Sequence, residues 1–209
     1  MKKTAVVLTL VLIFVSNAFS QNALVERIDK YRAKLDAALS PEGEYAGYAM
    51  VHTVNYESNV RAIGKQNTTI KFYYTQPGDS LKEENGMTEF VDIYKPPLKV
   101  SVVYNIAASQ NVSIDYYSDE NGNLVYYIYC TKGEYTNGEE YFYFENGKPV
   151  KIKYVATDPD KSVLEKYKTL DKDSGFAKEE LRKCAEILQK HREYNAFFSE
   201  MVKIEKRDK

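Results

Sequence analysis

The sequence predicts an α+β fold, in which an antiparallel β-meander sheet carries an N-terminal helix and C-terminal helices packed on its apolar face. Three observations lead to this prediction. Apolar residues recur at helical spacing near both ends of the chain, they alternate with polar residues through the middle, and turn signals separate the alternating segments every 8–12 residues or so.

The first 20 residues are predicted to be an export signal. Met1-Lys2-Lys3 gives a positive start, residues 5–15 form an apolar run interrupted only by Thr9, and Ala18-Phe19-Ser20 offers small residues for a signal peptidase. The run is too short for a stable membrane anchor, and no second run of spanning length follows. We therefore expect a bacterial protein that begins at Gln21, has no membrane span, and is exported to the periplasm or the cell exterior.

Residues 21–209 are predicted to form one domain. Of the 209 residues, 44% are hydrophobic and 28% are charged, which is typical of a globular protein. Loss of Lys2 and Lys3 with the signal leaves 27 basic against 30 acidic residues. A nucleic-acid partner is not expected, because it would require a basic surface.

The domain is predicted to begin with a helix over residues 22–39. Its apolar residues are spaced by three or four positions, and Ser40-Pro41 and Gly43 end it. After Gly43 the period changes to two, which predicts a sheet over about residues 45–156. The apolar positions of the alternating segments are even-numbered, as in Ile70, Phe72 and Tyr74, so these positions are expected to face the core.

Helical spacing returns after the sheet and predicts helices over about residues 159–205. Asp158 and Pro159 would begin the first of them, with Val163, Tyr167 and Leu170 on one face. A second, longer helix follows, with an apolar face made of Leu181, Cys184, Leu188, His191, Asn195, Phe198 and Val202.

A repeated triplet predicts the hairpin turns. Glu120-Asn121-Gly122 and Glu145-Asn146-Gly147 match, and Glu84-Asn85-Gly86 is a third copy. Cross-strand partners must share a face, so even-numbered pairs such as Tyr116 with Tyr126 and Phe142 with Val150 require an odd loop length. We therefore predict three-residue loops with the glycine in the left-handed conformation of a G1 bulge.

Two segments carry a resemblance to known proteins. Glu145-Asn146-Gly147-Lys148-Pro149-Val150 and Tyr94-Lys95-Pro96-Pro97-Leu98-Lys99-Val100 resemble pieces of uncharacterised exported bacterial β-meander proteins. The second segment also resembles the Lys-Pro start of a strand in periplasmic lipoprotein carriers of the LolA type. The first resemblance implies no activity. The second implies an apolar concave cavity.

Few residues suit catalysis or metal binding. His52 and His191 both lie at positions predicted to face the core, where a histidine is usually structural. No familiar hydrolase, phosphate-binding or zinc pattern is present, so we expect no catalytic residues, no metal site and no cofactor. Cys130 and Cys184 are predicted to point into the same layer between sheet and helix. Either they form a disulfide, which export would permit, or they are two buried free thiols.

The odd-numbered face of the sheet is the candidate binding surface. Tyrosine combines a large apolar ring with a polar tip, which suits contact with a protein or a glycan. Simple β-propensity also explains such a face. The leading hypothesis is a non-enzymatic exported binding module; the alternatives are a periplasmic carrier of an apolar ligand held between sheet and helices, and a hydrolase on an unfamiliar scaffold. The candidate residues are Tyr73, Tyr117, Tyr127, Tyr129, Tyr141, Tyr143 and Lys151.

Overall fold

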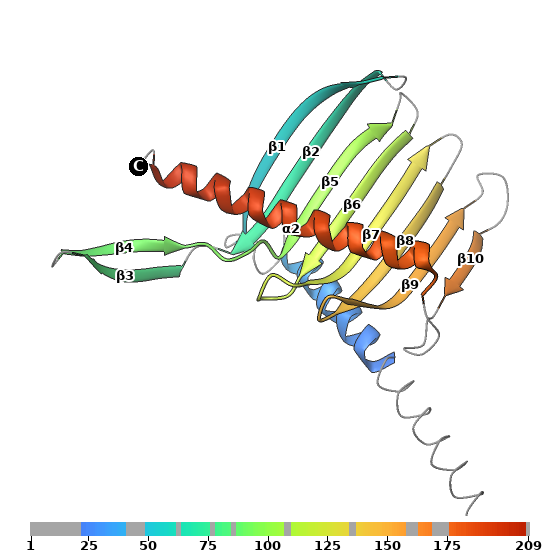
Figure 1. Cartoon of the computed structure of the whole chain (residues 1–209), viewed down its shortest axis with the longest axis horizontal. Helices are drawn as coiled ribbons and strands as arrows, with labels where there is room; N and C mark the ends of the chain where they lie inside the picture. The colour runs from blue at the N-terminus through green and yellow to red at the C-terminus, as the bar shows by residue number, and fades with distance from the viewer. Residues whose placement is uncertain are drawn as a thin grey trace, which may run out of the picture.

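Eight antiparallel strands form the main sheet, in the order β1-β2-β5-β6-β7-β8-β9-β10 (Figure 1). The computed structural model describes residues 22–40, 49–61, 64–75, 78–84, 87–106, 110–133, 137–157, 163–168 and 176–207. The strands are β1 Ala49–Val60, β2 Gly64–Thr75, β5 Lys99–Ile106, β6 Gln110–Ser118, β7 Leu124–Gly133, β8 Asn137–Glu145, β9 Lys148–Thr157 and β10 Val163–Lys168. Each strand pairs with its neighbour in sequence, apart from one inserted hairpin. The predicted α+β class and antiparallel meander are therefore confirmed.

The inserted hairpin consists of β3, Gly78–Glu84, and β4, Met87–Ile93, which pair only with each other. It projects from the sheet (Figure 1). The polar run from Asp79 to Asn85 predicts a loop from the sequence, and this expectation is wrong for residues 79–84, whereas Asn85 lies outside the described residues. Polar residues such as Asp79 and Glu83 are compatible with a strand here because the pairing of β3 with β4 supplies backbone hydrogen bonds.

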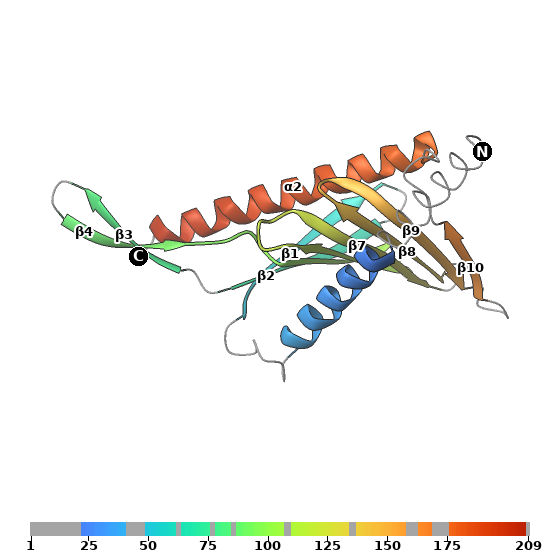
Figure 2. The ribbon, with the colours of Figure 1, turned by 90° about the horizontal axis from the view of Figure 1, so that it is seen from below.

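Two helices lie on opposite sides of the sheet (Figure 2). The first spans residues 22–38, close to the predicted range, and the second, α2, spans Lys178–Arg207. The prediction put all helices on one apolar face. The sheet has room for a helix on each side because tyrosines give its second face apolar area as well. The predicted signal at residues 1–20 lies outside the described residues.

Each helix shares a separate buried cluster with the sheet. Cys184, Ile187 and Phe198 of α2 lie with sheet residues such as Phe72 and Ile152. The cluster of the N-terminal helix contains Val25, Ile28, Leu35, Tyr117, Tyr126, Tyr143 and Val150. Burial of such side chains contributes roughly 1.5–3 kcal/mol each, so the two clusters are the main source of stability in the described chain.

Residues 163–168 form strand β10 and not the helix predicted from residue 159 onwards. β10 pairs with β9 from Val163 opposite Thr157 to Lys168 opposite Ile152. Val163 and Tyr167 fit a helical period of four, but Val163, Glu165 and Tyr167 equally fit a strand period of two. Pairing with the edge of β9 favours the strand, because it satisfies backbone groups that β9 would otherwise expose. The predicted helix start at Asp158-Pro159 is outside the described residues.

The two matching turns differ in length. At Glu120-Asn121-Gly122 the backbone N–H of Asp119 donates to Asn123 O over 2.9 Å, which closes the predicted three-residue loop, and Gly122 has φ +80°. At the other turn Glu145 pairs with Lys148, which leaves only Asn146 and Gly147, both with positive φ. The predicted positive φ of both glycines is confirmed, whereas the predicted loop length is wrong at the second turn.

Bulges next to these turns reset the register. Tyr117 pairs with Tyr126 and Ser118 with Leu124, so Val125 is an unpaired extra residue, and Val150 is the extra residue in β9. Tyr116 consequently pairs with Tyr127, not with Tyr126, and Phe142 pairs with Ile152, not with Val150. The bulge at Val125 inverts β7 from Tyr126 onwards, so that its odd-numbered side chains there face α2 and its even-numbered ones face the N-terminal helix, whereas Leu124 before the bulge lies in the cluster of α2.

Candidate functional site

The structure divides the predicted tyrosine face between the two sides of the sheet. Tyr127 pairs with Phe142 and belongs to the cluster under α2, and Tyr129 packs against that same cluster. Tyr117 and Tyr143 belong to the cluster under the N-terminal helix, and Tyr141 packs against it. The prediction that Tyr127, Tyr129, Tyr141 and Tyr143 share one face is therefore wrong, because the Val125 bulge inverts β7.

Most of these tyrosines are covered. Tyr117, Tyr127 and Tyr143 are buried, and Tyr73, Tyr129 and Tyr141 are half-buried. Lys151 places its ammonium nitrogen 5.5 Å from the ring centroid of Tyr143, a cation–π arrangement. Tyr126, which the sequence analysis left out of the candidate set, lies with Tyr117 and Tyr143 because of the register shift. These tyrosines therefore lie mainly in the layers between the sheet and its two helices, and they do not form one open surface.

A polar network holds the N-terminal helix against these tyrosines. The Lys99 ammonium lies 2.8 Å from Asp36 Oδ1 and 3.2 Å from Asp115 Oδ2, and the Tyr117 hydroxyl donates to Asp36 over 2.9 Å. Burial, together with the nearby carboxylates of Asp115 and Asp36, raises the pKa of Tyr117. The hydroxyl therefore stays a hydrogen-bond donor at physiological pH.

The same helix makes two further polar contacts. The Tyr143 hydroxyl donates to Asp29 Oδ1 over 3.1 Å, and the Arg32 guanidinium lies 5.2 Å from the ring centroid of Tyr126. Burial raises the pKa of Tyr143, and the nearby Asp29 carboxylate adds to this. Charged side chains one helical turn apart thus fix which face of the helix meets the sheet.

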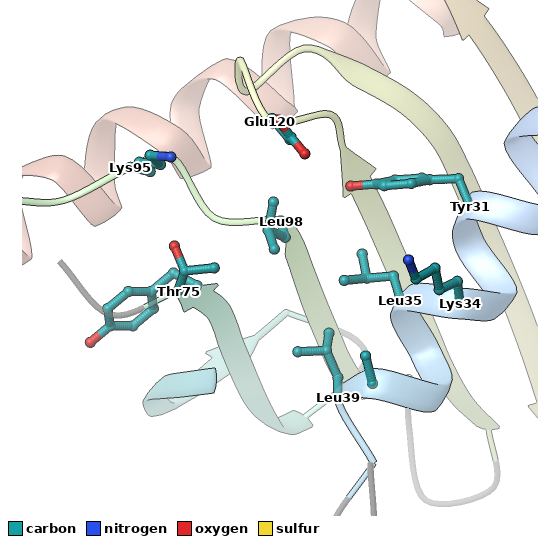
Figure 3. A pocket seen from close by; sticks show the side chains of 10 residues that line it. Tyr31, Lys34, Leu35, Leu39, Thr75, Lys95, Leu98 and Glu120 are labelled. Atoms are coloured by element: carbon teal, nitrogen blue, oxygen red, sulfur yellow. The ribbon is translucent and has the colours of Figure 1, made fainter. Parts of the chain in front are cut away.

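A pocket of about 350 Å³ opens beside this interface, between the end of the N-terminal helix and the ends of β2 and β5 (Figure 3). Leu35, Ala38 and Leu39 line it from the helix side, and Leu98 lines it from the segment before β5. Tyr74 and Thr75 contribute from the end of β2. Pro96 and Pro97 delay the start of β5 until Lys99, which leaves the sheet short at this point.

Polar groups line the other end of the pocket. Figure 3 shows Lys95, Glu120 and the Tyr31 hydroxyl on one side of the leucines, and Lys34 also lines the pocket. The Tyr31 hydroxyl donates to Ser118 O over 2.6 Å. Burial and the nearby Asp119 and Glu120 carboxylates raise the pKa of Tyr31 to about 12, so the hydroxyl remains protonated. The pocket thus combines an apolar floor with two ammonium groups and one carboxylate.

The two cysteines lie on opposite sides of the sheet. Cys130 pairs with Glu139 on the side of the N-terminal helix, with its Sγ 3.8 Å from Glu139 Oε1, whereas Cys184 belongs to α2 and lies in the cluster between α2 and the other side of the sheet. Both are buried free thiols. The disulfide alternative and the prediction that both thiols share one layer are wrong, because the inversion of β7 turns Cys130 away from α2.

The histidines occupy buried or half-buried structural positions. His191 Nε2 lies 2.8 Å from Ser118 Oγ, and the two residues are 3% and 0% exposed. A serine beside a histidine is a pair used by hydrolases, but here a substrate has no path to the hydroxyl oxygen. The His52 ring stacks on Tyr74 with centroids 5.1 Å apart. The first contact links β6 to α2, and the second links β1 to β2.

The described residues contain neither a metal cluster nor a membrane-spanning helix. No three His, Cys, Asp or Glu side chains in this part of the chain are grouped to hold a metal ion. None of the described helices is long and apolar enough to cross a membrane. Comparison with known proteins finds no matching family model, no similar curated protein and no similar solved structure.

Proposed function

We propose that this protein is an exported, non-enzymatic binding protein whose ligand is a small molecule with an apolar body and an anionic end. The observation that carries the proposal is the pocket of about 350 Å³ lined by Leu35, Leu39 and Leu98. Ligand pockets in proteins range from about 300 to 1,000 Å³ and combine apolar walls with a few polar groups. The proposal combines two hypotheses from the sequence: the non-enzymatic binding module and the carrier of an apolar ligand.

The size of the pocket limits the ligand. At the ~30 Å³ that one water molecule occupies in the liquid, 350 Å³ holds about a dozen non-hydrogen atoms. A medium-chain carboxylate such as decanoate has this size. An intact protein or a folded glycan does not fit, although a protein that presents a small apolar group could still place that group in the pocket.

The charges that line the pocket favour an anion. Lys34 from the helix and Lys95 from the segment before β5 bring two ammonium groups to the pocket, against the single carboxylate of Glu120. A carboxylate that reaches either lysine gains charge-assisted hydrogen bonds, whereas an ammonium group would meet like charges. We therefore expect decanoate to bind more tightly than decanol and much more tightly than decylamine.

The test is calorimetric titration of the protein, residues 21–209, with decanoate. For a ligand of this size, at roughly 0.5 kcal/mol per non-hydrogen atom, the dissociation constant should be in the tens of micromolar. Ala38→Leu fills the pocket and should abolish binding, whereas Ala37→Leu, on the exposed side of the same helix, should leave it unchanged. Failure of the wild type to bind, or equal binding by both variants, would refute the proposal.

Export is tested separately. Protein isolated from its native host should begin at Gln21, as the basic start and apolar run of the first 20 residues indicate. Intact mass would show residues 1–20 still present if the export proposal were wrong.

A further inference from the structure

Strand β1 is a long and nearly uncharged edge of the main sheet. It pairs with β2 on one side, and no described strand pairs with it on the other. Its 12 residues contain no proline, and Glu57 is the one acidic or basic side chain apart from His52. Edge strands are usually shortened, charged or interrupted by proline, because their open backbone groups otherwise accept another strand.

Exposed apolar side chains gather at this edge. The described residues include seven large apolar side chains that are exposed, and five of them lie on β1 or on the last turns of α2: Met50, Val51, Tyr56, Phe197 and Ile204. The ring centroids of Phe197 and Phe72 are 6.0 Å apart, and Phe72 pairs with His52 of β1. A concentration of this kind at one edge is typical of an interaction site.

The last turns of α2 also extend beyond the edge. Figures 1 and 2 show that both the C-terminal end of α2 and the β3–β4 hairpin project past β1, where the main sheet has ended. Ile204, 59% exposed, lies in the last turn of α2. A strand added to β1 would lie beneath the helix and bury side chains that the single chain leaves in water.

We propose that the added strand is β1 of a second copy of this chain, paired antiparallel about a two-fold axis perpendicular to the sheet. Such pairing requires that opposite residues share a face, so their numbers must both be even or both be odd. A register centred on Val54 meets this requirement and pairs residues 49–59, which is nearly the whole strand. The two-fold axis uses the β1 edge of both copies, so the assembly closes as a dimer.

The sequence of β1 is complementary to itself in this register. Thr53 lies opposite the partner's Asn55, and His52 lies opposite the partner's Tyr56. A Thr–Asn pair of this kind already occurs in the sheet, where the Thr69 hydroxyl donates to Asn55 Oδ1 over 2.7 Å, and His52 already stacks on a tyrosine, Tyr74, which lies diagonally across from it on β2. Glu57 lies opposite the partner's Val51, so no like charges meet. These features favour a second copy over an unrelated extended peptide.

Sedimentation equilibrium of residues 21–209 tests the proposal, with two double variants that differ only in charge. Thr53 and Asn55 are both exposed on the same face of β1. In Thr53→Glu/Asn55→Glu, like charges meet at two symmetric pairs. In Thr53→Lys/Asn55→Glu, opposite charges meet at the same two pairs. The wild type should be dimeric, and the first variant should dissociate at least tenfold more readily than the second.

Both variants lose the same bond from Thr69, but residue 53 also pairs with Lys71 of β2 in the same chain, so glutamate there gains a cross-strand charge contact and lysine loses one. The melting temperature of each variant at monomeric concentration therefore measures this difference in folding separately from self-association. A monomeric wild type would overturn the proposal. So would equal self-association of the two variants, because a dimer through any other surface would not distinguish them. Decanoate binding is measured independently, so either proposal can fail without the other.

Discussion

Lowering the pH from 7 to 5 should destabilise this protein through His191. Burial, with a smaller effect of the neighbouring Arg192, lowers the pKa of His191 from 6.5 to about 4, while Asp119 acts in the opposite direction. The unfolded chain therefore takes up a proton at a higher pH than the folded one. The stabilising contribution of the neutral imidazole is complete above pH 6.5 and is lost as the pH falls towards 4.

The size of the effect follows from the two pKa values. At about 1.4 kcal/mol for each tenfold change, the difference between 6.5 and about 4 corresponds to ~3 kcal/mol in total. Roughly 2 kcal/mol of this should be lost between pH 7 and pH 5. For a chain of 209 residues that corresponds to a fall in melting temperature of about 4–8 °C.

The assay is urea unfolding at pH 7, 6 and 5, followed by circular dichroism, for the wild type and His191→Gln. Glutamine keeps an amide near Ser118 Oγ but does not titrate, and all carboxylates titrate equally in both proteins. The stability advantage of the wild type should therefore shrink by roughly 2 kcal/mol between pH 7 and pH 5. If the two proteins lose stability in parallel, the imidazole is not held neutral by burial and the reasoning is refuted.

Two other predictions concern the turns and the cysteines. A methyl group at Gly122 would lie 2.8 Å from Pro96, whereas Gly147 has open space, so Gly122→Ala should cost about 2–3 kcal/mol of unfolding free energy and Gly147→Ala only ~1 kcal/mol. Equal costs in chemical denaturation would show that the contact with Pro96 is relieved. Cys130 and Cys184 should react with an alkylating reagent only after unfolding, and a reducing agent should leave the melting temperature unchanged. An intact mass two hydrogens short of the reduced chain would contradict this.

The sequence predicts the order of helices and strands better than the register in which the strands pair. The alternation in segments such as Val100 to Tyr104 is a local property, and the N-terminal helix follows from the spacing of Leu24 to Leu39. The bulge at Val125 has no such local signal. It depends on how the Asp119–Asn123 loop closes against β6, and a single extra residue reverses every side chain of β7 from Tyr126 onwards. The predicted tyrosine face and the shared cysteine layer both failed for this reason.

The pocket was not predictable because its walls come from distant parts of the chain. Leu39 ends the first helix, Leu98 precedes β5, and Glu120 lies in the loop after β6. Each residue alone is an ordinary helix end, strand start or turn residue. The double proline at residues 96–97 was a partial signal, because it marks where a strand must stop short and leave space.

Because β7 is inverted after Val125, local unfolding on the two faces of the sheet should be coupled. Tyr126 contacts Tyr117 and Tyr143 on one side of the backbone, and its neighbour Tyr127 contacts Tyr116 and Phe142 on the other. Release of either helix would expose one ring of this adjacent pair and loosen the strand that holds the other. Amide protons of β6, β7 and β8 should therefore exchange with solvent in one cooperative event, at the same free energy as those in the middle of α2.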